Sequence, residues 1–334
     1  MFVFKNLNPP QTYSRMMGAV TSFMVLLMGC AAPTPQETTS LVPEETTSLA
    51  SEETTSTKIM ATFLPMYLFT KAVAGPEGEV ELLVPANANI HSYQASPDEI
   101  RSLTEADILI KNGLGLEEFL DKMITNTANS QLQQIDASQG IEPLQEEEKH
   151  SGEDHDHDHD HGHSHEGGNP HVWLDPILAQ EQVINIRDGL IAADPENSQT
   201  YQTNAAAYLS QLQQLDQQFK AQLASLKGCQ FIAFHDAYPY LAERYGLEQI
   251  AVIQLPEDSL SPSDIQRVIN TAQQYNIKAL LSETGVEDNR LQRISEDTGL
   301  PVKTLDPIET GNLDPQYYLT AMENNLQTLV EACQ

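Results

Sequence analysis

Residues 194–226 read DPENSQTYQTNAAAYLSQLQQLDQQFKAQLASL. Within this stretch, apolar side chains recur at spacings of three and four from Ala205 to Leu226, and glutamine and aspartate fill the opposite face. That periodicity is typical of a helix with one buried stripe, and Asp194-Pro195 is a typical helix start. The pattern predicts a helix over 195–227. About thirty helical residues span about 45 Å, the width of a small domain, so we expect this helix to join two lobes.

On both sides of this helix, expected strands alternate with expected helices. The expected strands are 58–63, 80–84, 107–111 and 132–136 before it, and 230–234, 250–254, 278–282 and 302–305 after it. Ser96-Pro97-Asp98-Glu99 also has the pattern of a capping box at a helix start. Alternation of this kind is typical of parallel sheets covered by helices. The predicted fold is therefore α/β: two lobes, each a mostly parallel sheet flanked by helices, joined by one long rigid helix.

The amino-terminal residues have the pattern of an export signal. Lys5 and Arg15 precede an uncharged, mostly apolar stretch at 16–29, which is shorter than the roughly 20 residues of a membrane-spanning helix. The stretch ends in Leu-Met-Gly-Cys at 27–30, which resembles a bacterial lipobox. We therefore expect residues 1–29 to be a lipoprotein signal peptide and Cys30 to be a lipid anchor. A plain signal peptide is the alternative.

The rest of the chain divides by composition. Residues 30–57 repeat Glu-Thr-Thr-Ser three times with few bulky apolar residues, so a disordered tether is expected there. The expected first lobe is 58–194, including a His/Asp-rich loop at 142–168; the linking helix is 195–227; and the second lobe is 228–334. A formal net charge of −31 excludes nucleic acid as a partner.

The ten histidines fall into two groups. Three stand alone: His91, His171 and His235. The other seven crowd into the acidic loop: His150, His155, His157, His159, His161, His163 and His165. Imidazole is the commonest protein ligand for borderline metals at neutral pH. This distribution indicates a protein that binds a metal, with zinc as the leading candidate.

The lone histidines fall at the ends of expected elements. His91, His235 and Asp306 lie at or just beyond the carboxyl ends of expected strands, where ligands gather in α/β sheets. His171 precedes an expected helix start. Both lobes contribute, so a cleft between them would bring these residues together as a metal site. Either Asp306 or water could fill the fourth coordination position, and Glu283 is the runner-up carboxylate. Asp306 could instead be only a helix N-cap or turn residue.

The remaining two cysteines and the histidine loop carry separate expectations. Cys229 and Cys333 are either free or bridged, since an exported chain meets oxidising conditions. The histidine loop is expected to be an auxiliary weak metal site that captures, senses or delivers zinc. Its alternative is a solvated insert with incidental metal affinity.

Over roughly residues 58–334 the chain resembles the metal-binding solute-binding proteins of zinc and manganese ABC importers, the ZnuA-like or TroA-like group. The motifs that carry the resemblance are HSY at 91–93 with SP at 96–97, NPHVWLDP at 169–176, FHDAY at 234–238, and ET at 283–284 followed by LDP at 305–307. The resemblance implies two α/β lobes with metal between them. It also implies His91, His171 and His235 as ligands, with Asp306 completing or assisting the site.

The resemblance also indicates which metal and which partner to expect. Manganese-preferring members of the group have a carboxylate where this chain has His235, and three nitrogens with one oxygen suit tetrahedral zinc. The expected function is extracytoplasmic, high-affinity Zn²⁺ binding, with delivery to an ABC importer permease and its ATPase. The expected protein is a lipid-anchored monomer, in the periplasm or on the outer face of the cytoplasmic membrane. A zinc buffer or surface adhesin is the alternative; a zinc hydrolase lacks support, because no His-Glu-x-x-His motif is present.

Overall fold

The computed structural model describes residues 57–127, 129–144, 168–233, 235–251, 262–275, 277–283 and 289–334. All of them belong to one compact unit, Thr54–Gln334. The predicted signal peptide, Cys30, residues 31–56 of the tether and residues 145–167 of the His/Asp-rich loop lie outside the described residues. Within the described ranges, every helix is too short or too polar to cross a membrane.

The first lobe contains a four-stranded parallel sheet in the order β2-β1-β3-β4. Its strands are β1 Ile59–Ala61, β2 Val80–Leu82, β3 Ile108–Lys111 and β4 Gln133–Asp136. β1 and β3 occupy the centre and are almost wholly apolar and buried, as expected of strands covered on both faces.

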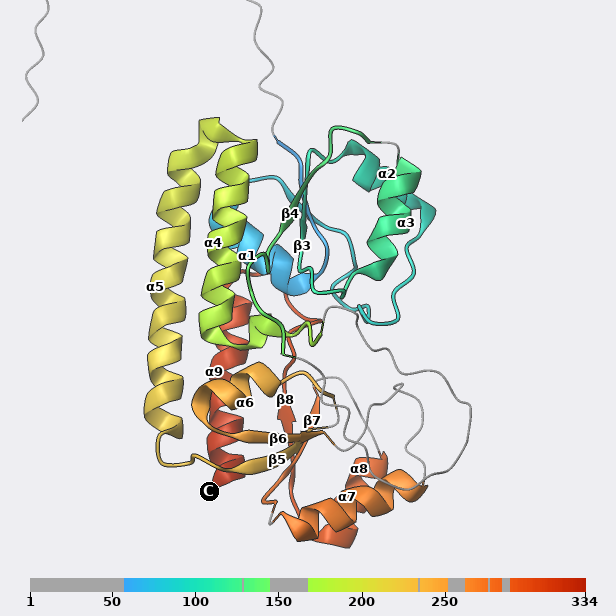
Figure 1. The fold of residues 1–334 in the computed structure, drawn as a ribbon, viewed down its shortest axis with the longest axis vertical. Helices are drawn as coiled ribbons and strands as arrows, with labels where there is room; N and C mark the ends of the chain where they lie inside the picture. The colour runs from blue at the N-terminus through green and yellow to red at the C-terminus, as the bar shows by residue number, and fades with distance from the viewer. Residues whose placement is uncertain are drawn as a thin grey trace, which may run out of the picture. The chain divides into compact units, whose positions relative to one another are not determined.

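Helices cover both faces of this sheet (Figure 1). Alternate residues of β1 face opposite ways: Ile59 packs with the core formed by α1, α4 and α5, and Met60 packs with α2 and α3. The helices are α1 Leu64–Ala74, α2 Pro97–Glu105, α3 Glu118–Thr127 and α4 Pro176–Ala193. The predicted capping box of α2 is present, since Ser96 N donates to Glu99 Oε2 at 2.6 Å and Glu99 N donates to Ser96 Oγ at 3.4 Å.

The predicted long helix is α5, Ser198–Leu223. It packs against α1 and α4 of the first lobe and against α9 and α6 of the second, so it joins the lobes as predicted (Figure 1). It is shorter than expected at both ends. A separate 3-10 turn, η2 Pro195–Asn197, precedes it, because Asn197 leaves helical geometry with φ −94° and ψ 8°. After Leu223, successive turns redirect the chain toward the second sheet.

The second lobe repeats the topology of the first. Its parallel sheet has the order β6-β5-β7-β8, the same permutation as β2-β1-β3-β4. The strands are β5 Gln230–Ala233, β6 Glu248–Ala251, β7 Leu280–Glu283 and β8 Val302–Leu305. The helices are α6 Pro239–Tyr245, α7 Pro262–Gln274, α8 Asn289–Thr298 and α9 Gln316–Cys333. The two-lobe α/β prediction is confirmed.

Two details of the second lobe add to the sequence prediction. β6 begins two residues earlier than the predicted 250–254, because this edge strand starts with the polar residues Glu248 and Gln249, which gave no apolar pattern. Cys229, just before β5, and Cys333, at the end of α9, form a disulfide with Cα atoms 5.8 Å apart. The bridge ties the first strand of this lobe to the last helix of the chain.

Candidate metal centre

His91 and His171 are presented by the first lobe through the same local device. An asparagine lies two residues before each histidine, Asn89 before His91 and Asn169 before His171. The side-chain oxygen of that asparagine accepts a hydrogen bond from the histidine backbone N–H. The distances are 2.8 Å for His91 and 3.1 Å for His171. An Asx turn of this type fixes the backbone direction locally. His171 then caps the short 3-10 helix η1, Val172–Leu174, and α4 follows directly.

His235 comes from the second lobe, two residues beyond the end of β5. Its Nδ1 lies 2.7 Å from Oε1 of Glu283, the last residue of β7. β5 and β7 are parallel neighbours, so the ends of both strands meet at one edge of the sheet. Glu283, the runner-up carboxylate of the sequence prediction, therefore orients His235 from behind and leaves Nε2 to face the site.

Glu309 completes the group, and it was not predicted. It follows β8 in the turn 306–309, where Ile308 has a left-handed φ of +62°. Its Oε1 lies 3.2 Å from His91 Nε2 and 3.3 Å from His171 Nε2. Glu309 is buried, although it comes from the opposite lobe to these two histidines.

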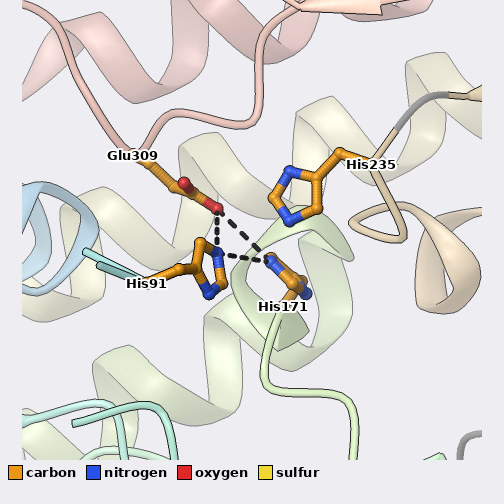
Figure 2. Close-up of side chains that lie close together, drawn as sticks. All are labelled: His91, His171, His235 and Glu309. Carbon is orange, nitrogen blue, oxygen red and sulfur yellow. Dashed lines mark hydrogen bonds and ion pairs between the residues drawn. The ribbon is translucent and has the colours of Figure 1, made fainter. Parts of the chain in front are cut away.

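The four side chains converge on one point, as Figure 2 shows. One donor atom from each of His91, His171, His235 and Glu309 can be chosen so that all four lie within 4.8 Å of one another, an arrangement able to hold a metal ion. His91 Nε2 and His171 Nε2 are 3.4 Å apart. Two ligands come from each lobe, as the sequence analysis expected for a site between lobes.

Asp306 has contacts that match its alternative role in the sequence analysis, that of a turn residue. Its Oδ1 accepts the Ile308 N–H at 2.8 Å, and its Oδ2 accepts the Tyr317 hydroxyl at 2.6 Å. Its backbone is held by the side chain of Asn325 in α9. Asp306 is thus absent from the converging group, and both of its carboxylate oxygens stabilise the turn that presents Glu309. Among the described residues, Glu309 and not Asp306 is the carboxylate that lies with the three histidines.

The turn that bears Glu309 is also held by the first lobe. The indole N–H of Trp173, a fully buried residue of η1, donates to the Pro307 carbonyl at 2.8 Å. The hydroxyl of Tyr318 donates in turn to the Trp173 carbonyl at 2.7 Å. Trp173 therefore connects the segment after His171 to the turn before Glu309.

Burial and mutual charge set the protonation of the site. Burial lowers the pKa of His171 to about 3, so this ring is neutral and can donate a lone pair. Burial alone would also lower the pKa of His235, but the carboxylates of Glu309 and Glu283 outweigh it and raise the pKa to about 9. Burial would raise the pKa of Glu309, yet His91 and His235 hold it well below its usual range. Without metal, the site therefore carries a proton on His235 beside an ionised Glu309.

Other predicted functional residues lie apart from this centre or outside the described residues. The predicted lipid-anchor residue Cys30 and the seven loop histidines, at 150–165, are outside the described ranges. Cys229 and Cys333 form their bridge away from the converging group. The signal that could have identified Glu309 is its place four residues after the strand end at Leu305, within reach of the same sheet edge as His235.

A half-buried centre of three imidazoles and a carboxylate, shared by two α/β lobes on a long helix, is the site of a metal-binding protein of the two-lobed solute-binding class. The chain belongs to the family described as "Zinc-uptake complex component A periplasmic", whose model matches residues 59–332.

Relatives of the chain are named for zinc uptake, zinc binding or manganese binding. It is 30% identical over 280 residues to the high-affinity zinc uptake system protein ZnuA of Bacillus subtilis, covering 82% of this chain and 86% of that protein. It is 32% identical to the zinc-binding lipoprotein AdcA of Streptococcus pneumoniae over 81% of this chain, but spans only 54% of AdcA. It is also 27% identical to the manganese-binding lipoprotein MntA of Halalkalibacterium halodurans, over 82% of this chain and 87% of MntA.

Solved structures show the same fold. The Zn(II)-bound AdcA of Streptococcus pneumoniae superimposes with a TM-score of 0.71 at 28% identity, covering 83% of this chain and 58% of AdcA. The laminin-binding protein Lmb of Streptococcus agalactiae, described as bifunctional with adhesin and metal transporting activity, gives a TM-score of 0.70 at 26% identity, covering 84% of this chain and all of Lmb.

Proposed function

We propose that this protein captures Zn²⁺ outside the cytoplasm through His91, His171, His235 and Glu309 and delivers it to an ABC importer permease driven by its ATPase. The spacing of the donor atoms is the observation that carries this proposal. Three of the separations are 3.2, 3.3 and 3.4 Å. Four ligands placed tetrahedrally about 2.0–2.1 Å from a zinc ion stand roughly 3.3–3.4 Å apart.

The chemistry of the donors supports zinc over manganese. Three imidazole nitrogens and one carboxylate suit a borderline cation, whereas manganese favours more oxygen ligands. Two of the imidazoles are oriented through Nδ1, His171 by Asn169 and His235 by Glu283, as is usual for histidines that bind zinc. The zinc names of ZnuA and AdcA support the same choice, and the name of MntA makes manganese the competitor to test.

The proposal also covers delivery of zinc to the permease, the cellular location of the protein and the organisation of its chain. Family membership supports the ABC importer as partner and an extracytoplasmic place, with Cys30 as the lipid anchor after a signal peptide at 1–29. The histidine loop would bind further zinc ions weakly, and a monomer suffices because one chain supplies all four ligands. We retain the division into lobes at 58–194 and 228–334 with the linking helix at 195–227.

No catalysis is part of the proposed function. A zinc hydrolase keeps one coordination position open for water, whereas in the proposed site Glu309 would supply the fourth ligand. Binding and release of the ion require no reaction on a substrate.

Calorimetric titration of Zn²⁺ and Mn²⁺ into residues 54–334, with 145–167 deleted, tests metal choice. We expect one tight zinc site, much weaker manganese binding, and loss of the tight site in His235→Ala. A preference for manganese would contradict the proposal. Delivery is tested by ⁶⁵Zn uptake in cells that lack this protein: the wild-type chain should restore uptake, and His171→Ala should not.

The similarity to Lmb favours one second candidate, a surface adhesin that also binds zinc. Uptake separates the two functions. An adhesin or zinc buffer would bind zinc with the same site, yet deleting the gene would leave ⁶⁵Zn uptake at its wild-type rate. Loss of uptake on deletion favours the importer.

A further inference from the structure

Asn169 contacts both lobes beside the metal centre. It is 3% exposed and lies two residues before His171. Its side-chain oxygen faces His171 Nδ1 at 3.0 Å and accepts the His171 backbone N–H at 3.1 Å. Its side-chain nitrogen donates to the Asp236 carbonyl at 2.7 Å. Asp236 directly follows His235, so one amide side chain joins a ligand of the first lobe to the backbone beside a ligand of the second.

These contacts fix which nitrogen of His171 is free. Because the Asn169 Nδ2 donates to a carbonyl, its Oδ1 must be the atom that faces the ring, and an amide oxygen only accepts. His171 Nδ1 therefore carries the proton and Nε2 is left with its lone pair. Nε2 is the atom that lies 3.3 Å from Glu309 Oε1. The neutral ring is thus held in the tautomer that binds a metal through Nε2.

The main chain of Asn169 is held by Tyr240 of the second lobe. The Tyr240 hydroxyl donates to the Asn169 carbonyl at 2.6 Å and accepts the Leu144 N–H at 2.9 Å. The Asn169 N–H donates to the Leu144 carbonyl at 3.0 Å, which closes a ring of hydrogen bonds. Tyr240 belongs to α6 and is 5% exposed, packed with Ile141 and Val172. The hydroxyl of Tyr240 in this ring is therefore on a buried side chain, and α6 fixes its position.

We propose that Asn169, held by Tyr240, is a positioning residue that sets the tautomer of His171 and its distance from His235 before metal enters. The proposal rests on the proposed zinc-binding function and adds residues that are not ligands. If two of the four ligands are already placed across the lobes, binding has less ordering entropy to overcome. Removing the hydrogen bonds of Asn169 should then lower the zinc affinity clearly while changing the stability of the fold less.

The experiment uses the full chain and four variants. Zinc affinity of the tightest site is measured by competition with a chelator, and thermal unfolding is recorded alongside. Loss of an outer partner of a metal ligand typically costs about 10–100-fold in affinity, and we expect a loss in that range for Asn169→Ala. A smaller loss is expected for Tyr240→Phe, which keeps both side-chain bonds of Asn169. Tyr201→Phe is the matched control, because it also removes a buried tyrosine hydroxyl, one that donates to Asp194 at 2.7 Å. The zinc affinity of Tyr201→Phe should equal the wild-type value.

A second measurement separates positioning from general stability. Nitrogen NMR of ¹⁵N-histidine-labelled, metal-free protein reports the tautomer of His171. We expect the Nδ1–H form in the wild type and in Asn169→Asp, which keeps the acceptor but loses the donor to Asp236, and a mixed population in Asn169→Ala. Asn169→Asp should still bind zinc more weakly than the wild type, because the link between lobes is broken.

Two results would overturn the positioning role: wild-type zinc affinity in Asn169→Ala, or an Nε2–H tautomer of His171 in the wild type. Wild-type affinity in Tyr240→Phe alone would overturn the part of the proposal in which Tyr240 holds Asn169. Failure of the proposed function is distinguishable from either. In that case the wild-type chain itself would lack a tight zinc site, while the tautomer measurement would still decide whether Asn169 orients His171.

Discussion

The hydroxyl of Tyr317 donates to Oδ2 of Asp306 at 2.6 Å, while the other oxygen of Asp306 accepts the Ile308 N–H at 2.8 Å. Ile308 is buried with a φ of +62°, a conformation that costs a β-branched residue roughly 1–3 kcal/mol. The contacts of Asp306 hold the chain in this conformation, and the strained turn points Glu309 at the histidines. Asp306, which directly follows β8, therefore stabilises the turn. Glu309, three residues later, faces the metal centre.

A pair of isosteric substitutions distinguishes these roles. Glu309→Gln removes the anionic ligand, and we expect a loss of zinc affinity above the roughly 10–100-fold that is usual for residues behind a ligand. Asp306→Asn keeps one acceptor oxygen for the turn, so the loss should be about 10-fold or less. Chelator competition measures both, and a larger effect in Asp306→Asn than in Glu309→Gln would contradict the assignment.

Zinc binding should release a proton from His235. Glu309 and Glu283 outweigh burial and raise its pKa to about 9, so below that pH the metal-free site holds a proton that zinc must displace. Affinity should therefore rise as pH increases toward about 9. His171, with its pKa lowered to about 3, should release none.

Calorimetry at pH 7.5 in buffers with different ionisation enthalpies measures this release directly. We expect close to one proton from His235 for each zinc bound. A release that persists unchanged in His235→Ala would show that the proton comes from another group.

The sequence predicted those features that local patterns of residues determine. It did not predict features that depend on contacts between residues far apart in the chain. Strand β8 was predicted with the same bounds as observed, Val302–Leu305, and the alternation around α5 predicted both sheets. Glu309 was missed because its direction depends on the left-handed backbone at Ile308, which no periodicity reports. The contact of Tyr240 with Asn169 joins residues 71 positions apart, and such pairings emerge only when the two lobes pack.

Trp173 offers a test of how the lobes are fastened together. Trp173→Phe keeps an aromatic ring against Phe63, whose centroid lies 5.0 Å away, but removes the N–H that donates to Pro307. A buried carbonyl left without its donor costs about 1–3 kcal/mol. Urea unfolding should show a loss of that size, with weaker zinc binding because the Glu309 turn is loosened. Unchanged stability would indicate that another donor reaches the Pro307 carbonyl.

The disulfide should contribute to stability but not to metal binding. Cys229 and Cys333 close a loop of 104 residues, and the chain-entropy model assigns about 4–5 kcal/mol to a loop of this length. We expect the double variant Cys229→Ser, Cys333→Ser to lose several kcal/mol in guanidinium unfolding. Its zinc affinity should match the wild type under conditions where it is folded, because neither cysteine belongs to the converging group. A weakened zinc site in the folded double variant would show that the bridge also supports the metal centre.

Two deletions that differ by a few residues test how the histidine loop is attached to the metal centre. Leu144 and Asn169 lie on either side of 145–167, and the Asn169 N–H donates to the Leu144 carbonyl at 3.0 Å. A deletion of 145–167 retains Leu144, so the ring with Tyr240 survives, and calorimetry should show the tight zinc site unchanged with the weaker ions lost. A deletion of 142–168 also removes Leu144, the donor to the Tyr240 hydroxyl, and should weaken the tight site itself. Equal tight-site affinity in the two deletions would mean that the ring around Asn169 does not depend on Leu144, and loss of the tight site in both would place the main zinc ligands within the loop.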